Sequence, residues 1–278
     1  TPTKTFNAMF SVAIVLLALY TLLGTQINQI GFFGMITTDA PAIIGQAIIL
    51  VASALFLPLS LTSQRFHEYE YSEFFALFLF MVTGFQVMVS TDNIILMFIS
   101  LETASLALYT LIAMHNRDRS IEAAIKYFTM GALAAGFFAF GGALFYLATG
   151  SVNLTESYAA IEASGVKNYE ALLIALVFLI GAIGFKLSIV PLHTWTPDVY
   201  EGASAPLAGY MSIVPKIATF VLALRLFEYL VSIDVEWIKT MLWIAAVTTM
   251  TIGNILALVQ ESVKRMLAFS SISHAGFG

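Results

Sequence analysis

Long apolar runs separated by short polar connections dominate the sequence. A helix that crosses the hydrocarbon core of a bilayer needs about 20 apolar residues, and its backbone groups must find their hydrogen bonds inside the helix. The runs therefore predict an all-α fold, a polytopic bundle of transmembrane helices. Nine segments are expected to form it: Asn7–Gly24, Ala40–Leu61, Phe74–Thr91, Asn93–Met114, Ala123–Gly150, Ala171–Leu192, Ala203–Leu224, Thr240–Gln260 and the shorter Met266–Gly278.

The composition supports this class and excludes several others. Of the 278 residues, 59% are hydrophobic and only 10% are charged, whereas a soluble domain carries about 25% charged residues. The chain has no cysteine, which excludes disulfides, zinc–thiolate sites and iron–sulfur clusters within it. The net charge is −5 and the charges are scattered, so no basic stripe is available for nucleic acid. We expect a single transmembrane domain over residues 1–278, without a bound cofactor or metal.

The basic residues predict the orientation of the chain. Alternate connections lie on the same side of a membrane, and cytoplasmic connections carry an excess of Lys and Arg. One side collects Lys4, Arg65, Arg117, Arg119, Lys264 and Arg265, whereas the other collects Lys167 and Lys239. The first side is therefore expected to be cytoplasmic, and the longest connection, Ser151–Glu170, is expected on the opposite side.

Four ionisable residues fall inside the apolar runs, although a charge at the bilayer centre costs about 2.5–3.5 kcal/mol on insertion scales. These residues are Glu102, Lys126, Lys186 and Lys216. Lys186 precedes Pro191 by five residues and Lys216 directly follows a second proline, and proline disrupts helices. Interrupted helices with ionisable groups near mid-membrane mark ion sites in transporters.

A buried lysine is suited to proton transfer because desolvation disfavours its ammonium form while a nearby carboxylate favours it. Movement of Glu102 relative to Lys186 would then load or unload a proton. The alternative is that Glu102, Lys186 and Lys216 form static ion pairs that hold helices together.

Two further residues have open interpretations. Lys126 lies near a predicted cytoplasmic helix end, so it either takes part in proton transfer or extends its ammonium to the interface. His274 follows a hydroxyl-rich stretch; it either passes protons along a water chain or is a buried histidine hydrogen-bonded to a neighbouring helix.

Two motifs resemble a known family. The segment Pro191–Pro206 reads PLHTWTPDVYEGASAP, and the segment Ser270–Gly276 reads SSISHAG. Both resemble the antiporter-like subunits of proton-pumping NADH–quinone oxidoreductase (respiratory complex I) and of the related multisubunit cation/proton antiporters. The sequence VYEGA at residues 199–203 and the stretch Glu122–Phe128 are more typical of subunit N of complex I. Ser204 departs from the family pattern, which often has proline there.

The resemblance implies a subunit of fourteen helices with two inverted five-helix repeats, each containing a broken helix. This chain would run from the second helix to part of the tenth as a fragment of a longer protein, with the first repeat at 74–230 and the start of the second at 237–278. By motif, Glu102, Lys126, Lys186 and Lys216 match protonatable residues of the fifth, sixth, broken seventh and eighth helices.

The resemblance also implies a function. Quinone reduction elsewhere in the complex would drive proton transfer through these residues, and NADH and quinone would be used by other subunits. The partners would be the membrane and peripheral subunits of complex I and the lipid bilayer, with the bacterial inner membrane as the location. The alternatives are a subunit of a cation/proton antiporter and a structural spacer of the membrane arm. We expect the segment Trp195–Glu201 to be a solvated turn; the alternative is that its Asp198 and Glu201 contribute to cytoplasmic proton uptake.

Overall fold

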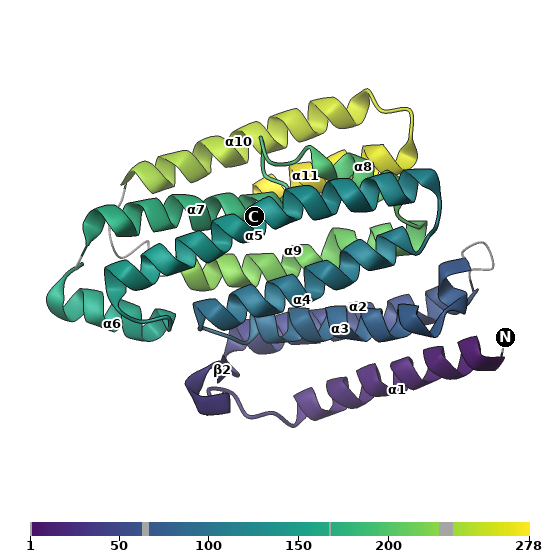
Figure 1. The fold of residues 1–278 in the computed structure, drawn as a ribbon, viewed down its shortest axis with the longest axis horizontal. Coiled ribbons are helices and arrows are strands. Elements are labelled where there is room, and N and C mark those ends of the chain that lie inside the picture. The colour runs from purple at the N-terminus through teal and green to yellow at the C-terminus, as the bar shows by residue number, and fades with distance from the viewer. Residues whose placement is uncertain (1, 63–66, 167, 228–235) are drawn as a thin grey trace.

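The structure is a computed structural model that describes residues 2–62, 67–166, 168–227 and 236–278 (Figure 1). It consists almost entirely of α-helices that run along a common direction. The elements in chain order are α1 Pro2–Leu23, β1 Ile30–Gly31, the 3₁₀-helix η1 Phe32–Gly34, β2 Ile36–Thr37, α2 Ala40–Thr62, the 3₁₀-helix η2 His67–Glu70, α3 Ser72–Val89, α4 Ile94–Ala113, α5 Asp118–Thr149, α6 Leu154–Ser164, α7 Tyr169–Leu187, α8 Trp195–Gly202, α9 Ala205–Phe227, α10 Glu236–Leu258 and α11 Val263–Phe277.

The predicted all-α membrane bundle is confirmed. Within the described residues, eight helices are long and apolar enough to cross a membrane, namely α1, α2, α3, α4, α5, α7, α9 and α10. The ninth predicted segment forms most of α11, which has 15 residues. At about 1.5 Å per residue it is shorter than a bilayer core, and the C-terminus lies partway along the bundle in Figure 1.

The basic residues gather as the orientation analysis predicts, as far as they are described. The start of α1, the α4–α5 connection and the start of α11 lie at the same end of the bundle (Figure 1). This end, called the basic end below, carries Lys4, Arg117, Arg119, Lys264 and Arg265. Arg65 and Lys167 lie outside the described residues, as does the predicted repeat boundary at residue 230.

Two helices lie in segments expected to be irregular. The connection Ser151–Glu170 contains α6, whose first turn is capped by the Asn153 side chain. The segment Trp195–Glu201, expected to be a solvated turn, is instead the helix α8, with Trp195, Val199 and Tyr200 buried. Packing explains why this segment is a buried helix and not a solvated turn, because the Trp195 ring stacks on Tyr127 of α5 with ring centroids 4.5 Å apart.

The two prolines have different effects on their helices. The helix predicted to reach residue 192 ends at Leu187, and residues 188–194 separate α7 from α8, so the break predicted near Pro191 is present. The break predicted at Pro215 is wrong, because α9 is continuous from Ala205 to Phe227. Proline deprives the carbonyl four residues earlier of its helical donor. At Met211 the Tyr200 hydroxyl donates to that carbonyl at 3.2 Å, so the helix persists.

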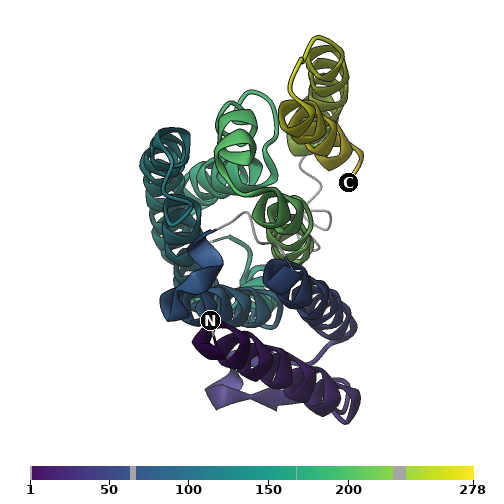
Figure 2. The ribbon, with the colours of Figure 1, turned by 90° about the vertical axis from the view of Figure 1, so that its right-hand side faces the viewer.

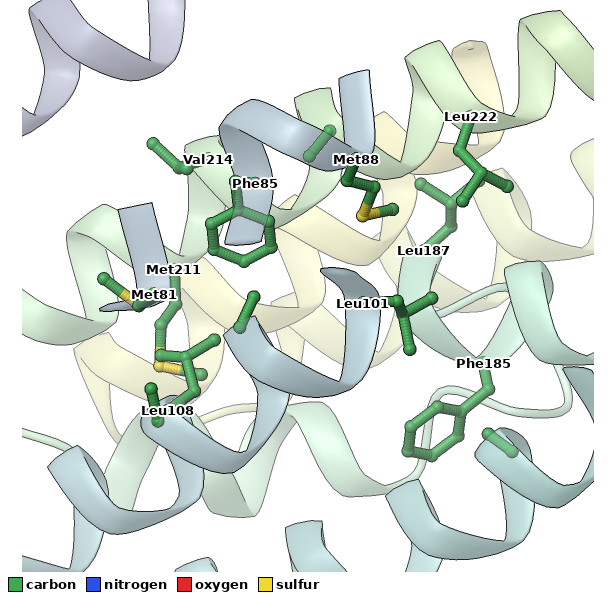
Figure 3. Packing of buried hydrophobic residues seen from close by; sticks show 14 of the residues in the cluster. Met81, Phe85, Met88, Leu101, Leu108, Phe185, Leu187, Met211, Val214 and Leu222 are labelled. Atoms are coloured by element: carbon green, nitrogen blue, oxygen red, sulfur yellow. The ribbon is translucent and has the colours of Figure 1, made fainter. Parts of the chain in front are cut away.

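The core lies where α3, α4, α7 and α9 meet (Figure 3). Met81, Phe85 and Leu108 are buried there. Gly84 lets α3 approach α4 closely, because a Cβ at that position would lie 2.8 Å from the backbone nitrogen of Ala104; small residues have this role between membrane helices. At the edge of the bundle opposite α1, α10 packs on α11 (Figure 2).

Candidate functional site

Lys186 occupies the last turn of α7, immediately before the helix break. Its Nζ donates a hydrogen bond to Ser105 Oγ of α4 at 2.7 Å. Three aromatic rings surround the same nitrogen, with centroids 5.9 Å away for Tyr109, 5.9 Å for Tyr127 and 5.8 Å for Phe185. Aromatic faces within about 6 Å stabilise a cation, so the site is able to hold an ammonium group without a carboxylate in direct contact.

Glu102 lies on the face of α4 that also carries Ser105, three residues further on, which is one helical turn. Its Oε1 is buried and has no hydrogen-bond partner in the described structure. Glu102 and Lys186 influence each other electrostatically, but the two side chains make no ion pair within 4.0 Å among the described residues. A small movement of either helix would therefore change the charge–charge distance.

Lys216 lies on α9 and is 8% exposed. Its Nζ donates to the backbone oxygen of Ser271 and, at 2.6 Å, to the hydroxyl of the same residue. Ser271 belongs to α11, so this lysine joins the α9 helix to the segment predicted to begin the second repeat. Lys186 and Lys216 are thus each held by a hydroxyl group, a contact that either lysine can keep with or without its extra proton.

Lys126 lies outside this buried group. It is 45% exposed and forms ion pairs with Glu122 at 2.7 Å and with Asp198 of α8 at 2.9 Å. Arg265 of α11 also contacts Asp198, at 2.7 Å, and reaches Glu201 at 3.2 Å. Burial would raise the pKa of Asp198, but the hydrogen bonds from Lys126 and Arg265 outweigh it and hold that pKa below its usual value.

A polar pocket of about 160 Å³ opens within this charged network at the basic end. It is lined by Arg119, Glu122, Ala123, Lys126, Asp198, Glu201 and Gly202. The network links α5, α8 and α11, so neither Asp198 nor Glu201 belongs to a free turn.

His274 is exposed on α11. Its Nδ1 lies 2.7 Å from the backbone oxygen and 3.5 Å from the hydroxyl of Ser270, both one turn earlier on the same helix. In the described structure it has no hydrogen bond to a neighbouring helix. The structure therefore brings Glu102 and Lys186 together, ties Lys216 to α11, and leaves Lys126 and His274 at the periphery.

Sequence reasoning missed the environment of Arg225, which lies in the last turn of α9. Arg225 is 6% exposed and pairs with Asp39 at 2.7 Å and Asp92 at 2.6 Å; it also donates to the Val89 backbone oxygen at 2.9 Å. A signal was available, because both aspartates adjoin apolar runs at the membrane side where the run Ala203–Leu224, directly before Arg225, ends.

His193, in the break between α7 and α8, was also not singled out. Its Nδ1 is buried and unpartnered in the described structure, and its ring lies 6.5 Å from that of Phe269 on α11. Burial lowers the pKa of His193 despite a hydrogen bond with the Pro191 backbone, so the environment beside the helix break favours the neutral imidazole.

A broken membrane helix that ends in a lysine, with a carboxyl group on the facing helix, is an arrangement typical of ion sites in membrane transport proteins. The particular family follows from the sequence, since residues 91–278 match the profile of the NADH:quinone oxidoreductase/Mrp antiporter transmembrane family. The chain belongs to this family and is an integral membrane protein.

Individual relatives agree with this assignment. The chain is 64% identical over 247 residues to NADH-quinone oxidoreductase subunit N of Sulfurimonas denitrificans, covering 89% of this chain and 49% of the relative. It thus spans about half the length of that curated relative. The resemblance to subunit N deduced from the motifs is confirmed.

Solved structures agree as well. A chain of respiratory complex I from Thermus thermophilus with bound aureothin matches 99% of this chain and 58% of its own length, with a TM-score of 0.82 and 33% identity. A chain of the Mrp complex from Dietzia sp. DQ12-45-1b matches 99% of this chain and 31% of its own length, with a TM-score of 0.85. At 20% identity the second match shows the fold alone.

Proposed function

We propose that the chain forms part of a proton-translocating membrane subunit of an NADH–quinone oxidoreductase. The observation that carries the proposal is the Lys186 site: a lysine at the end of a broken helix, faced by a Glu102 carboxyl with an unpartnered buried oxygen. A static ion pair would hold the two groups in contact. Here the groups are close enough to influence each other, and no ion pair within 4.0 Å holds them in contact among the described residues.

In this proposal Glu102, Lys186 and Lys216 are the relay. When Glu102 approaches, its charge favours the ammonium form of Lys186; when it withdraws, burial favours release of the proton. Lys216 extends the route towards α11 through Ser271. Lys126 and His274 have weaker roles, because one is held in ion pairs at the surface and the other is exposed.

Redox chemistry belongs to the partners in this proposal. We infer that other membrane and peripheral subunits oxidise NADH and reduce quinone, and that the energy reaches this chain as a conformational or electrostatic change. The location would be a bacterial inner membrane, in agreement with the bacterial relatives. Such a chain is a subunit of a translocase without redox chemistry of its own.

Two other functions are compatible with the same fold. An antiporter subunit would exchange sodium or potassium for protons, and a spacer would move nothing. The names of two curated relatives, both subunit N of NADH-quinone oxidoreductase, favour the oxidoreductase over the antiporter.

Substitution of the facing carboxyl tests the proposal. Glu102→Gln in the complete subunit, within its complex, should lower proton pumping by at least about tenfold while the complex assembles, because the amide keeps the shape of the side chain and removes the charge that loads the lysine. Pumping is measured in inverted vesicles with and without sodium. Thr103→Ala, on the exposed side of α4, is the matched control. Unchanged pumping by Glu102→Gln would contradict the relay, and pumping that requires sodium would favour the antiporter.

A further inference from the structure

One face of α4 presents three polar side chains to Lys186. Glu102, Ser105 and Tyr109 follow one another at spacings of three and four residues, which places them on the same face of a helix. Ser105 accepts the hydrogen bond from Lys186, and the Tyr109 ring lies 5.9 Å from the Lys186 nitrogen. Tyr109 is the member of this row nearest the basic end, which the distribution of Lys and Arg predicts to be cytoplasmic.

The hydroxyl of Tyr109 is not explained by packing. The residue is 6% exposed, and its oxygen has no partner with full hydrogen-bond geometry in the described structure. The Ser105 hydroxyl lies close enough to act on it as a side-chain hydrogen-bond partner, and the Glu102 charge also acts on it. The ring packs against Tyr127 at 4.6 Å and Phe128 at 5.8 Å. Phenylalanine would keep these ring contacts without burying an unpaired hydroxyl, which is costly.

Gly131 on α5 leaves room for this hydroxyl. A Cβ at residue 131 would lie 2.0 Å from the Tyr109 oxygen and 2.9 Å from the ring carbon that bears it. Any side chain at this position would displace the phenol. Two helices are therefore shaped to keep the hydroxyl beside the lysine site.

Tyr109 also contacts α5, the helix that helps to line the polar pocket at the basic end. Tyr127 packs edge-to-face on Tyr109, and the next residue back along α5, Lys126, lines the polar pocket at the basic end together with Asp198. The buried phenol is therefore packed against a residue of α5 whose neighbour in the sequence lines the polar pocket.

We propose that the Tyr109 hydroxyl delivers protons to Lys186 from the basic, cytoplasmic side. The phenol gives its proton to the free amine of Lys186, and its oxygen takes a proton from water on the side of the polar pocket. Two O–H bonds break, one in the phenol and one in a protonated water (H3O⁺) at the pocket, while an N–H bond and a new phenol O–H bond form. The protonated water is left as neutral water, the amine becomes an ammonium, the phenol is neutral before and after, and no electron moves. The inference rests on the proposed relay function and adds the group that reloads it.

Tyr109→Phe in the complete subunit within its complex tests the inference. Because the ring remains, assembly should be unchanged, while proton pumping in inverted vesicles should fall by about tenfold or more at alkaline pH, where the donor is needed most. The loss should be smaller at acidic pH, where protons are abundant. Pumping equal to that of the unsubstituted complex at every pH would overturn the proposal, as would an equal loss at every pH.

Gly131→Ala provides a second, independent test because it displaces the hydroxyl without removing it. It should reproduce the pH-dependent loss, and it should add a smaller loss in the Tyr109→Phe background, where the hydroxyl contact is gone and only the 2.9 Å contact with the ring carbon remains. An equal additional loss in both backgrounds would mark a packing defect and overturn the proposal. The matched control is Gly136→Ala on the same helix, where a Cβ would meet nothing within 4 Å.

Lys186→Ala separates this inference from the function on which it rests. If Lys186→Ala leaves pumping unchanged, the relay itself fails, and Tyr109 has no lysine to reload. If Lys186→Ala abolishes pumping while Tyr109→Phe is silent at every pH, the relay stands and only the role of Tyr109 is overturned.

Discussion

Lys186→Ala in the complete subunit is expected to abolish proton pumping while the complex still assembles. The lysine makes one side-chain hydrogen bond, to Ser105 at 2.7 Å, and no ion pair among the described residues, so its removal strands no buried charge partner in contact with it. The three surrounding rings would remain packed. The loss should therefore be one of proton transfer and not of folding.

Lys186→Arg distinguishes a lysine that transfers protons from one that supplies only a fixed positive charge. Arginine keeps a positive charge but cannot give up its proton in a protein, so a relay should fail with arginine as it does with alanine. A structural spacer would need only the charge and the bulk. Lys4→Ala, at the basic end, is the lysine control and should pump normally.

The measurement follows proton pumping in inverted vesicles with quinone reductase turnover in parallel. Collapse of pumping in both Lys186 variants, with the complex assembled, is the expected outcome. If Lys186→Ala changes neither pumping nor turnover, the relay assignment is contradicted and the spacer function gains support. Normal pumping by Lys186→Arg alone would reduce the lysine to a fixed charge.

The sequence predicted the helices that face lipid because their signal is local. A spanning helix is an apolar run of sufficient length, and eight of the nine predicted segments are such helices. The break after Lys186 was also predictable, since Pro191 lies within the apolar run. The cost of burying a charge in lipid identified Glu102, Lys186 and Lys216 from the sequence alone.

The contacts around the site could not be predicted in the same way because they join distant segments. The Tyr200 hydroxyl that sustains α9 across Pro215 comes from another helix, and no local pattern shows that the Met211 carbonyl will find this donor. The helix α8 is stabilised by stacking of Trp195 on Tyr127, which its eight residues cannot indicate by themselves. The roles of the relay residues remain predictions.

The ion pairs of Arg225 could not be predicted either, because they also join segments that are distant in the sequence. They lead to the second prediction. Asp39 is 186 residues away from Arg225 in the sequence. The ion pairs of Arg225 with Asp39 and Asp92 join the C-terminal end of α9 to the start of α2 and to the α3–α4 connection. In addition, Thr155 of α6 donates a hydrogen bond to the second carboxylate oxygen of Asp92 at 3.3 Å. One buried arginine thus ties the helix that carries Lys216 to the beginning of the helix that carries Glu102.

Arg225→Ala is expected to destabilise the subunit by about 3 kcal/mol. Removing one partner of a buried ion pair costs about 3–5 kcal/mol because a charge is left uncompensated, and the lower end applies since Asp39 and Asp92 are 30% and 25% exposed. Two carboxylates would then face each other without a cation, and the Val89 carbonyl would lose its side-chain donor.

Arg225→Lys should restore only part of this stability, because a single ammonium cannot reproduce the planar fork that reaches two carboxylates and a carbonyl. Thermal unfolding of the purified complex and the amount of assembled subunit measure the effect, and Lys239→Ala serves as a basic-residue control. Pumping per assembled complex should be unchanged, since Arg225 holds helices in place and carries no proton. A variant that assembles at the normal level but pumps poorly would instead place Arg225 on the proton route.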